Sequence, residues 1–199
     1  MKILKNEPLK QHTSFRVGGP AKVYVVPEDI EELQKLIRFL HEEKLPYDII
    51  GNGTNLLVSD AGVNHVVVEI GRALEGIELL PEANASDATS SLRGSSSVTG
   101  TAAKAAAGSA AARATSEADA VNATAAKEKI YYLRVLAGTL LSKAAQFAAT
   151  QELSGMEALR GIPGTLGGAV TMNAGAYGTE MKDVLYSVDV LTPEGELRT

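Results

Sequence analysis

The stretch GIPGTLGGAVTMNAGAYG, residues 161–178, holds six glycines and one proline among small apolar residues. Glycine loses more conformational freedom on folding than any other residue, so this many in one place indicate tight turns or the close approach of another group. A bulky, flat ligand that carries phosphate is one such group. A loop of tight turns explains the glycines equally well, and the stretch alone leaves both interpretations open.

The composition of the 199-residue chain, 45% hydrophobic, is typical of a globular protein with one large or two small domains. Its net charge of -5 and the lack of a basic cluster argue against a nucleic-acid partner. No cysteine is present and the three histidines stand apart, so no metal is expected. No signal peptide or membrane-spanning stretch is visible, and we expect a cytoplasmic protein without a membrane partner.

Hydrophobic spacing predicts the elements of the first half of the chain. Residues 22–27 alternate like a strand, and residues 27–45 follow with a helical period. Further strands are predicted at 48–50 and 65–70. This order of strand, helix and strand indicates an α/β unit. The residues expected on the buried face of the helix are Ile30, Leu33, Leu36, Ile37 and Leu40.

The second half is predicted to begin with a hairpin of strands at 76–80 and 129–137. Between them, the 44 residues from 83 to 126 include 17 alanines and no aromatic residue. Such a segment offers too little apolar surface to offset the entropy of ordering, so we expect a mobile insertion that tolerates deletion. Its Ala-rich half, around 101–114, has high helix propensity, which leaves a transient or docked helix possible.

Beyond the hairpin, a helix is predicted at 139–153 and a strand at 184–192. A turn at 193–196 then leads into residues 197–199, which are expected to pair with that strand. The sequence stops inside this hairpin, which indicates a fragment of a longer protein.

Three glycine-containing stretches carry the functional signal: TSFRVGGPA at 13–21, GNGTNLL at 51–57, and residues 161–178. None is a GxGxxG or GxxxxGK[ST] nucleotide motif. In GNGTN, small residues let successive backbone N–H groups point at one anion, and the side chains of Thr54 and Asn55 add donors. An ordinary turn remains the alternative for this stretch.

In this order the three stretches closely resemble the flavin-binding part of the UDP-N-acetylenolpyruvoylglucosamine reductase family, which acts in peptidoglycan biosynthesis. The resemblance covers residues 1–80 and about 128–199, in LKQHTSFRVGGPA, IIGNGTNLLVSD and LSGMEALRGIPGTLGGAVTMNAGAYG. It implies an α+β fold of two FAD-binding subdomains of the vanillyl-alcohol-oxidase type. The expected subdomains are 1–74 and 75–199, the second interrupted by 83–126, with the substrate domain absent.

The resemblance also implies which residues hold the cofactor. The loop at 51–55 would hold the pyrophosphate, residues 161–168 would wrap around the flavin where a Cβ would clash, and residues 173–178 would continue the wall beside the isoalloxazine. Arg16 is expected to support this site, with a surface ion pair as the alternative. The cofactor-binding residues implied are Arg16, Gly51, Asn52, Gly53, Thr54, Asn55, Leu56, Gly161, Ile162, Pro163, Gly164, Thr165, Gly167, Gly168, Asn173, Gly175, Ala176, Tyr177 and Gly178.

The family's reaction passes hydride from NADPH to FAD and then to a UDP-sugar substrate, which a serine protonates. The family's catalytic arginine, serine and glutamate match nothing in residues 1–199, so no catalytic residue is assigned and the activity of this chain alone is left open. FAD is expected to be noncovalent, because the glycine motifs hold no cysteine or histidine tether. The alternatives are a non-catalytic scaffold module and a related alcohol or sugar-lactone oxidase. The oligomeric state is not predicted.

Overall fold

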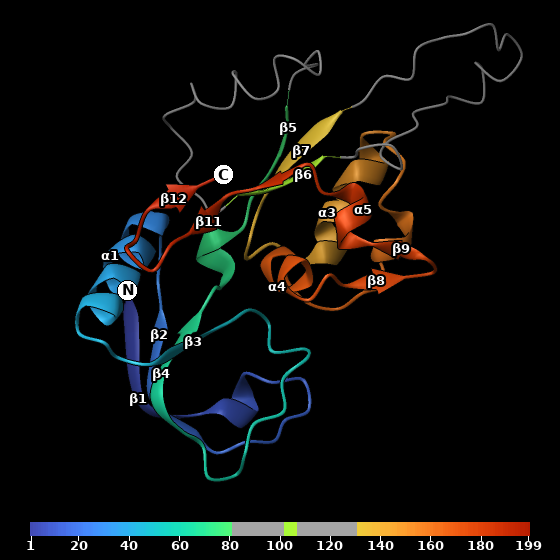
Figure 1. Cartoon of the computed structure of the whole chain (residues 1–199). Coiled ribbons are helices and arrows are strands. Elements are labelled where there is room, and N and C mark those ends of the chain that lie inside the picture. Colours follow the sequence, from blue (N-terminus) through green and yellow to red (C-terminus); the bar gives the residue numbers. More distant parts are fainter. Residues whose placement is uncertain (81–101, 107–130) are drawn as a thin grey trace, which may run out of the picture.

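The computed structural model describes residues 1–80, 102–106 and 131–199, the segment 102–106 by its backbone alone. Two four-stranded sheets form two lobes side by side (Figure 1). The chain crosses from the first lobe to the second near residue 75 and returns with its last hairpin. The predicted subdomain boundary at 74/75 stays a prediction, although the strands of the first sheet all precede it.

The first sheet combines four strands in the order β1-β2-β4-β3. β2 (Pro20–Val26) runs parallel to β4 (Val63–Glu69), which runs parallel to β3 (Tyr47–Ile50). β1 (Lys2–Pro8), which the sequence analysis did not predict, pairs antiparallel with β2 and leads into the short helix η1 (Leu9–Gln11). The strands predicted at 22–27, 48–50 and 65–70 are confirmed.

Helix α1 (Ile30–Glu42) connects β2 to β3 and covers one face of this sheet (Figure 1). Asp29 caps it by accepting a hydrogen bond from the N–H of Glu32 at 2.7 Å. The helical spacing of the sequence is confirmed, because the residues that it predicted to be buried are all in the core: Ile30, Leu33, Leu36, Ile37 and Leu40.

Two residues of α1 give a matched test of this packing. Ile37 is 2% exposed and Phe39 is 53% exposed. We expect Ile37→Ala to lower the free energy of unfolding by about 2–5 kcal/mol, because it leaves a cavity in the core. Phe39→Ala should change it by no more than about 0.5 kcal/mol. Urea unfolding followed by circular dichroism measures both, and equal losses would contradict the assigned helix face.

The second sheet has the order β10-β6-β7-β5, and its neighbouring strands are antiparallel. Its strands are β5 (Ile77–Leu79), β6 (Ala102–Ala106), β7 (Tyr132–Leu136) and β10 (Ser187–Val188). The predicted pairing of the strands at 76–80 and 129–137 is confirmed, with Ile77 opposite Val135. The helices of this lobe are α3 (Leu141–Thr150), α4 (Leu166–Thr171), α5 (Met181–Val184) and the short η4 (Glu157–Leu159). The short η2 (Arg72–Leu74) precedes the crossing, and its Leu74 is buried in the core of the first lobe.

The strand β6 corrects the prediction for residues 102–106. The segment 83–126 was expected to be a mobile insertion with a possible helix around 101–114, whereas residues 102–106 form a strand between β7 and β10. The mobility of the segment and its tolerance of deletion stay predictions. Strand pairing uses backbone groups, so an Ala-rich segment can complete a ladder without large side chains, and the tertiary setting overrides its helix propensity. The rest of the predicted insertion lies outside the described residues.

The end of the chain departs from one continuous strand at 184–192. Residue 184 ends α5, and two short strands, β10 and β11 (Val190–Leu191), follow. The predicted hairpin is confirmed, because β11 pairs with β12 (Leu197–Arg198). Its turn contacts α1 of the first lobe: the Gln34 amide donates to the Gly195 carbonyl at 3.1 Å, and Arg38 Nε donates to the Glu194 carbonyl at 3.2 Å. The hairpin therefore ties the two lobes together.

Candidate functional site

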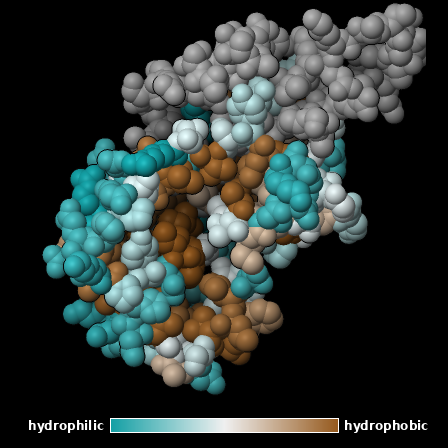
Figure 2. Space-filling model, in the orientation of Figure 1, coloured by the Kyte–Doolittle hydropathy of each residue, from teal (hydrophilic) through white to brown (hydrophobic). Residues whose placement is uncertain are grey.

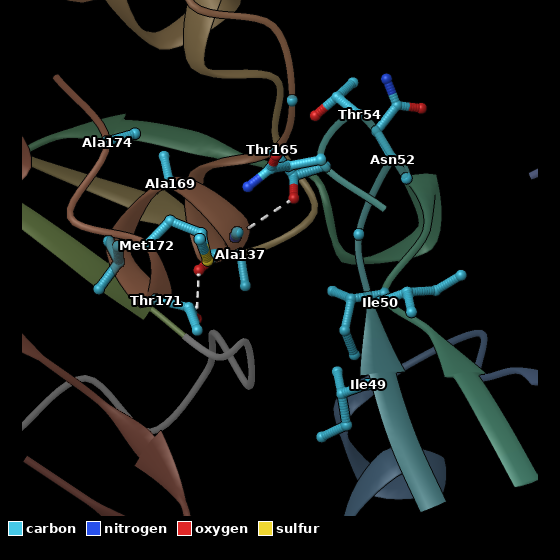
Figure 3. A pocket seen from close by; sticks show the side chains of 18 of the residues that line it. Ile49, Ile50, Asn52, Thr54, Ala137, Thr165, Ala169, Thr171, Met172 and Ala174 are labelled. Atoms are coloured by element: carbon cyan, nitrogen blue, oxygen red, sulfur yellow. Dashed lines mark hydrogen bonds between the residues drawn. The ribbon is translucent and has the colours of Figure 1, made fainter. Parts of the chain in front are cut away.

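A cavity of about 610 Å³ opens between the two lobes. Figure 2 shows hydrophobic residues gathered in this hollow. One wall comes from the end of β3, with Ile49 and Ile50, and the facing wall comes from α4, with Ala169 and Met172 (Figure 3). Residues 188–191 line it as well. An apolar cavity of this size with polar groups at one end suits a cofactor-sized ligand.

The polar end of the cavity is the loop 51–55, which follows β3. Among the described residues, none accepts a hydrogen bond from the backbone N–H groups of Asn52, Gly53, Thr54 or Asn55. The Asn52 and Asn55 side chains are exposed and likewise have no partner there. Successive unpaired N–H groups form the kind of concave donor set that binds an anion.

This loop meets the glycine-rich stretch 161–168 from the other lobe. Thr54 Oγ1 donates to the Pro163 carbonyl at 3.3 Å. A Cβ on Gly51 would overlap Thr165 Oγ1, and a Cβ on Gly164 would lie 2.8 Å from Thr54 Oγ1. These two glycines therefore let the loops touch each other, a reason for glycine that the sequence analysis did not foresee.

Helix α4 lies inside the glycine-rich stretch 161–178, for which tight turns and the close approach of a ligand were both left open. Thr165 caps it by accepting from the N–H of Gly168 at 3.4 Å. The N–H of Leu166 donates to the Thr139 carbonyl at 2.7 Å, and that of Gly167 donates to the Ala137 carbonyl at 2.9 Å. The first donors of α4 are thus already used, and the unpaired donors described above belong to the loop 51–55.

Most of the predicted cofactor residues line the cavity. They are Gly51, Asn52, Gly53, Thr54, Asn55, Leu56, Ile162, Pro163, Gly164, Thr165, Gly167 and Gly168. The structure thereby brings the second and third glycine stretches together across the cavity, as Figure 3 shows for Asn52, Thr54 and Thr165. That these residues bind a cofactor stays a prediction.

Other predicted residues are not part of the lining: Arg16, Gly161, Asn173, Gly175, Ala176, Tyr177 and Gly178. The last five belong to the segment around the hairpin of β8 (Gly175–Ala176) and β9 (Thr179–Glu180). Asn173 donates from its amide to Glu180 at 2.8 Å and accepts from the N–H of Lys182 at 3.0 Å. These bonds join Asn173 to residues 180 and 182 and so close the segment into a local hairpin. Tyr177 in this segment is 95% exposed. Arg16 is exposed, with a positive φ of 54°.

Apolar side chains from both lobes also line the cavity, and sequence reasoning missed them. They are Leu33, Ile49, Ile50, Ile70, Ala137, Ala169, Val170, Met172, Ala174, Val188, Val190 and Leu191, with Thr171 and Asp189 as polar members. Leu33 stands on the predicted buried face of α1, and most of the others lie at or near the end of a strand or helix, which was their only sequence signal. Asp189 is the one charged residue among the described residues of the lining, so an anionic ligand here would depend on neutral N–H and amide donors.

Behind the loop 51–55, a buried tyrosine supports the end of β4. The Tyr24 hydroxyl donates to Glu69 Oε2 at 2.6 Å, and its ring is fully buried. Burial raises the pKa of Tyr24 well above its ordinary value, and the bond to Glu69 adds to this. Burial also raises the pKa of Tyr132 in the second lobe.

These shifts predict alkaline destabilisation. The unfolded chain ionises its tyrosines near pH about 10, whereas folded Tyr24 keeps its proton, so the folded state holds more protons above that pH. The free energy of unfolding should therefore fall as pH rises above about 10. Urea unfolding across this range measures the fall, which should be shallower in Tyr24→Phe. An identical pH slope in the variant would contradict the assignment.

The family described as FAD binding domain matches residues 21–91 and 118–199. These ranges make up more than half of the chain, which belongs to this family. The α+β architecture with two FAD-binding subdomains of the vanillyl-alcohol-oxidase type is thereby confirmed. Outside the match lie residues 1–20 and residues 92–117, and the latter fall within the Ala-rich segment.

Individual relatives are UDP-N-acetylenolpyruvoylglucosamine reductases. That of Agathobacter rectalis is 40% identical over 99% of this chain and 51% of its own length, and that of Caldanaerobacter subterraneus is 42% identical over 96% and 46%. The crystal structure of UDP-N-acetylenolpyruvylglucosamine reductase from Thermus caldophilus matches with a TM-score of 0.57 and 30% identity, over 99% of this chain and 50% of that one. The chain thus spans about half the length of these relatives and resembles their FAD-binding portion. In the described part of the chain, no helix has the length and apolar character to cross a membrane.

Proposed function

We propose that this chain binds FAD noncovalently in the cavity between its two lobes. The observation that carries the proposal is the meeting of two glycine loops beside an apolar cavity, with four successive N–H donors at residues 52–55 that bond to no acceptor in the described part of the chain. The pyrophosphate would accept hydrogen bonds from these N–H groups and from the amides of Asn52 and Asn55. The apolar faces of β3 and α4 would hold the isoalloxazine and exclude water from it.

The lining supports noncovalent binding of a ligand that carries hydroxyl groups. No described lining residue is a histidine or a cysteine, the side chains that tether flavins in related folds. Asp189 accepts from Thr199 through Oδ1 at 2.6 Å, which leaves its other carboxylate oxygen to accept from a ligand hydroxyl. The polar groups of the lining therefore fit a ligand with an anionic group and hydroxyl groups.

We further infer that the whole protein reduces UDP-N-acetylenolpyruvoylglucosamine with NADPH in peptidoglycan biosynthesis, in the cytoplasm. The support is the similarity to reductases of that name over nearly the full chain. Bound FAD would supply the hydride chemistry, and these two subdomains would supply its position and its shielding from water. The proposal includes no catalytic side chain from residues 1–199.

Two experiments test this function. Purified chain is incubated with FAD and passed through a desalting column, and retained flavin is read by its visible absorbance and then released with acid. Retention with full release supports noncovalent FAD, whereas no retention contradicts it. The reaction is tested on the whole protein without oxygen, where NADPH consumption must depend on the enolpyruvyl substrate. NADPH consumption at the same rate with and without the enolpyruvyl substrate would contradict the proposed activity.

A further inference from the structure

A hydrogen-bonded network lies behind the loop 51–55 and outside the cavity lining. His12 Nε2 lies 2.9 Å from Glu7 Oε1, and His12 Nδ1 lies 2.8 Å from the Tyr24 hydroxyl. That hydroxyl donates to Glu69 at 2.6 Å, and the rings of His12 and Tyr24 contact each other at a tilt of 35°, with centroids 4.2 Å apart. The four side chains come from β1, the segment after η1, β2 and β4.

Two carboxylates flank the His12 ring. Nε2 lies 2.9 Å from Glu7 Oε1, and Nδ1 lies 3.7 Å from Glu69 Oε2, the oxygen that accepts from the Tyr24 hydroxyl. The Tyr24 oxygen therefore joins the side chains of His12 and Glu69.

The network reaches the cavity loop at two points. The His12 carbonyl oxygen occupies the place where a Cβ on Gly53 would lie, and the N–H of Ser14 donates to the Gly53 carbonyl at 3.0 Å. At the other point, Glu69 pairs with Ile50, and the N–H of Ile70 donates to the Ile50 carbonyl at 2.8 Å. One contact thus holds the middle of the loop, and the other holds the residue at which the loop begins.

We propose that His12, Tyr24 and Glu69 are positioning residues that hold the loop 51–55 with its N–H donors convergent before a diphosphate arrives. The inference rests on the proposed FAD binding and adds residues that never touch the cofactor. Preorganised donors bind more tightly, because the loop is already ordered before binding and loses little conformational entropy when the ligand binds. Breaking the network should therefore weaken FAD binding more than it weakens the fold.

The test compares Tyr24→Phe with Tyr47→Phe. The first variant keeps the buried ring and removes the hydroxyl that joins His12 to Glu69, whereas Tyr47 has no hydroxyl partner among the described residues and lies outside the cavity lining. We expect Tyr24→Phe to raise the Kd for FAD at least about tenfold, because it removes a hydrogen bond to a charged group. The Kd of Tyr47→Phe for FAD should stay within about twofold of the wild-type value, because this substitution removes a hydroxyl that makes no described hydrogen bond. His12→Gln, which retains one side-chain donor, should lie between wild type and His12→Ala.

A second readout separates positioning from general destabilisation. Backbone ¹⁵N relaxation without FAD should report larger motion at residues 52–55 in Tyr24→Phe, with β5 and β7 of the other lobe unchanged. Affinity within twofold of wild type in Tyr24→Phe, or unchanged loop motion, would overturn the inference. If wild-type chain binds no FAD, the proposed function fails by itself, and the relaxation comparison alone decides whether the network holds the loop.

Discussion

Gly168→Leu is expected to abolish FAD binding while the chain stays folded. Gly168 lines the cavity from α4, and a Cβ built on it meets only Thr165 Oγ1, at 3.4 Å. A leucine side chain there is expected to occupy space that the ligand needs, whereas the helical backbone of α4 can hold leucine without a clash. We expect the Kd for FAD to rise at least about a hundredfold, which corresponds to about 2.7 kcal/mol.

The fold should tolerate this change, because leucine favours a helix over glycine by up to about 1 kcal/mol. Gly161→Leu is the matched control: it lies in the same stretch, outside the lining, and its Cβ meets nothing within 4 Å. Fluorescence titration of FAD measures the affinity, and thermal unfolding checks the fold. Equal affinity in the two variants would mean that FAD binds somewhere other than this cavity.

Gly53→Ala is expected to damage both the loop and the affinity. Gly53 has a positive φ of 60°, and an added Cβ would overlap the backbone carbonyl of His12 and lie 3.1 Å from Thr13 Cα. Backbone cannot rotate away as a side chain does, so the loop must shift. Strain of this kind costs about 1–3 kcal/mol at one residue, and the clash adds to it. FAD affinity should fall by at least about tenfold, which corresponds to about 1.4 kcal/mol.

Gly178→Ala distinguishes the clash from the backbone conformation. Gly178 also has a positive φ, 85°, but a Cβ on it meets nothing within 4 Å. The free energy of unfolding of Gly178→Ala should therefore fall only by the cost of the left-handed backbone conformation, about 1–2 kcal/mol, and the variant should keep its FAD affinity. Urea unfolding and FAD titration of both variants make the comparison. A Gly53→Ala chain that matched Gly178→Ala in stability and affinity would contradict the close packing of His12 on the loop.

The sequence predicted best where local periodicity and tertiary structure agree. In α1 the apolar spacing, the acidic first turn and the cap at Asp29 all favour one helix, and each predicted core residue is buried. The strand β6 is the opposite case, because Ala102–Ala106 have helix propensity and become a strand only through pairing with β7 and β10. No pattern in the local sequence predicts the register in which β6 pairs with β7 and β10.

For the site, the sequence predicted that close approach occurs but not between which groups. Gly51 and Gly164 make room for the opposite loop, and Gly167 makes room for Ala137, with its Cβ position 2.9 Å from that side chain. The segment from Asn173 to Gly178 is equally rich in small residues, yet of its members only Ala174 lines the cavity. Asn173 bonds instead to Glu180 and Lys182. Glycine-rich sequence thus occurs both where a ligand can approach and where protein segments pack against each other. Only the folded structure distinguishes the two cases.

The central claim is that FAD lies between the two lobes with its pyrophosphate on the loop 51–55. A crystal structure of the chain with FAD tests it most directly. We predict the pyrophosphate within hydrogen-bonding distance of the N–H groups of residues 52–55, and the flavin ring between β3 and α4. FAD bound at any other surface, or this cavity empty in crystals grown at saturating FAD, would contradict the account.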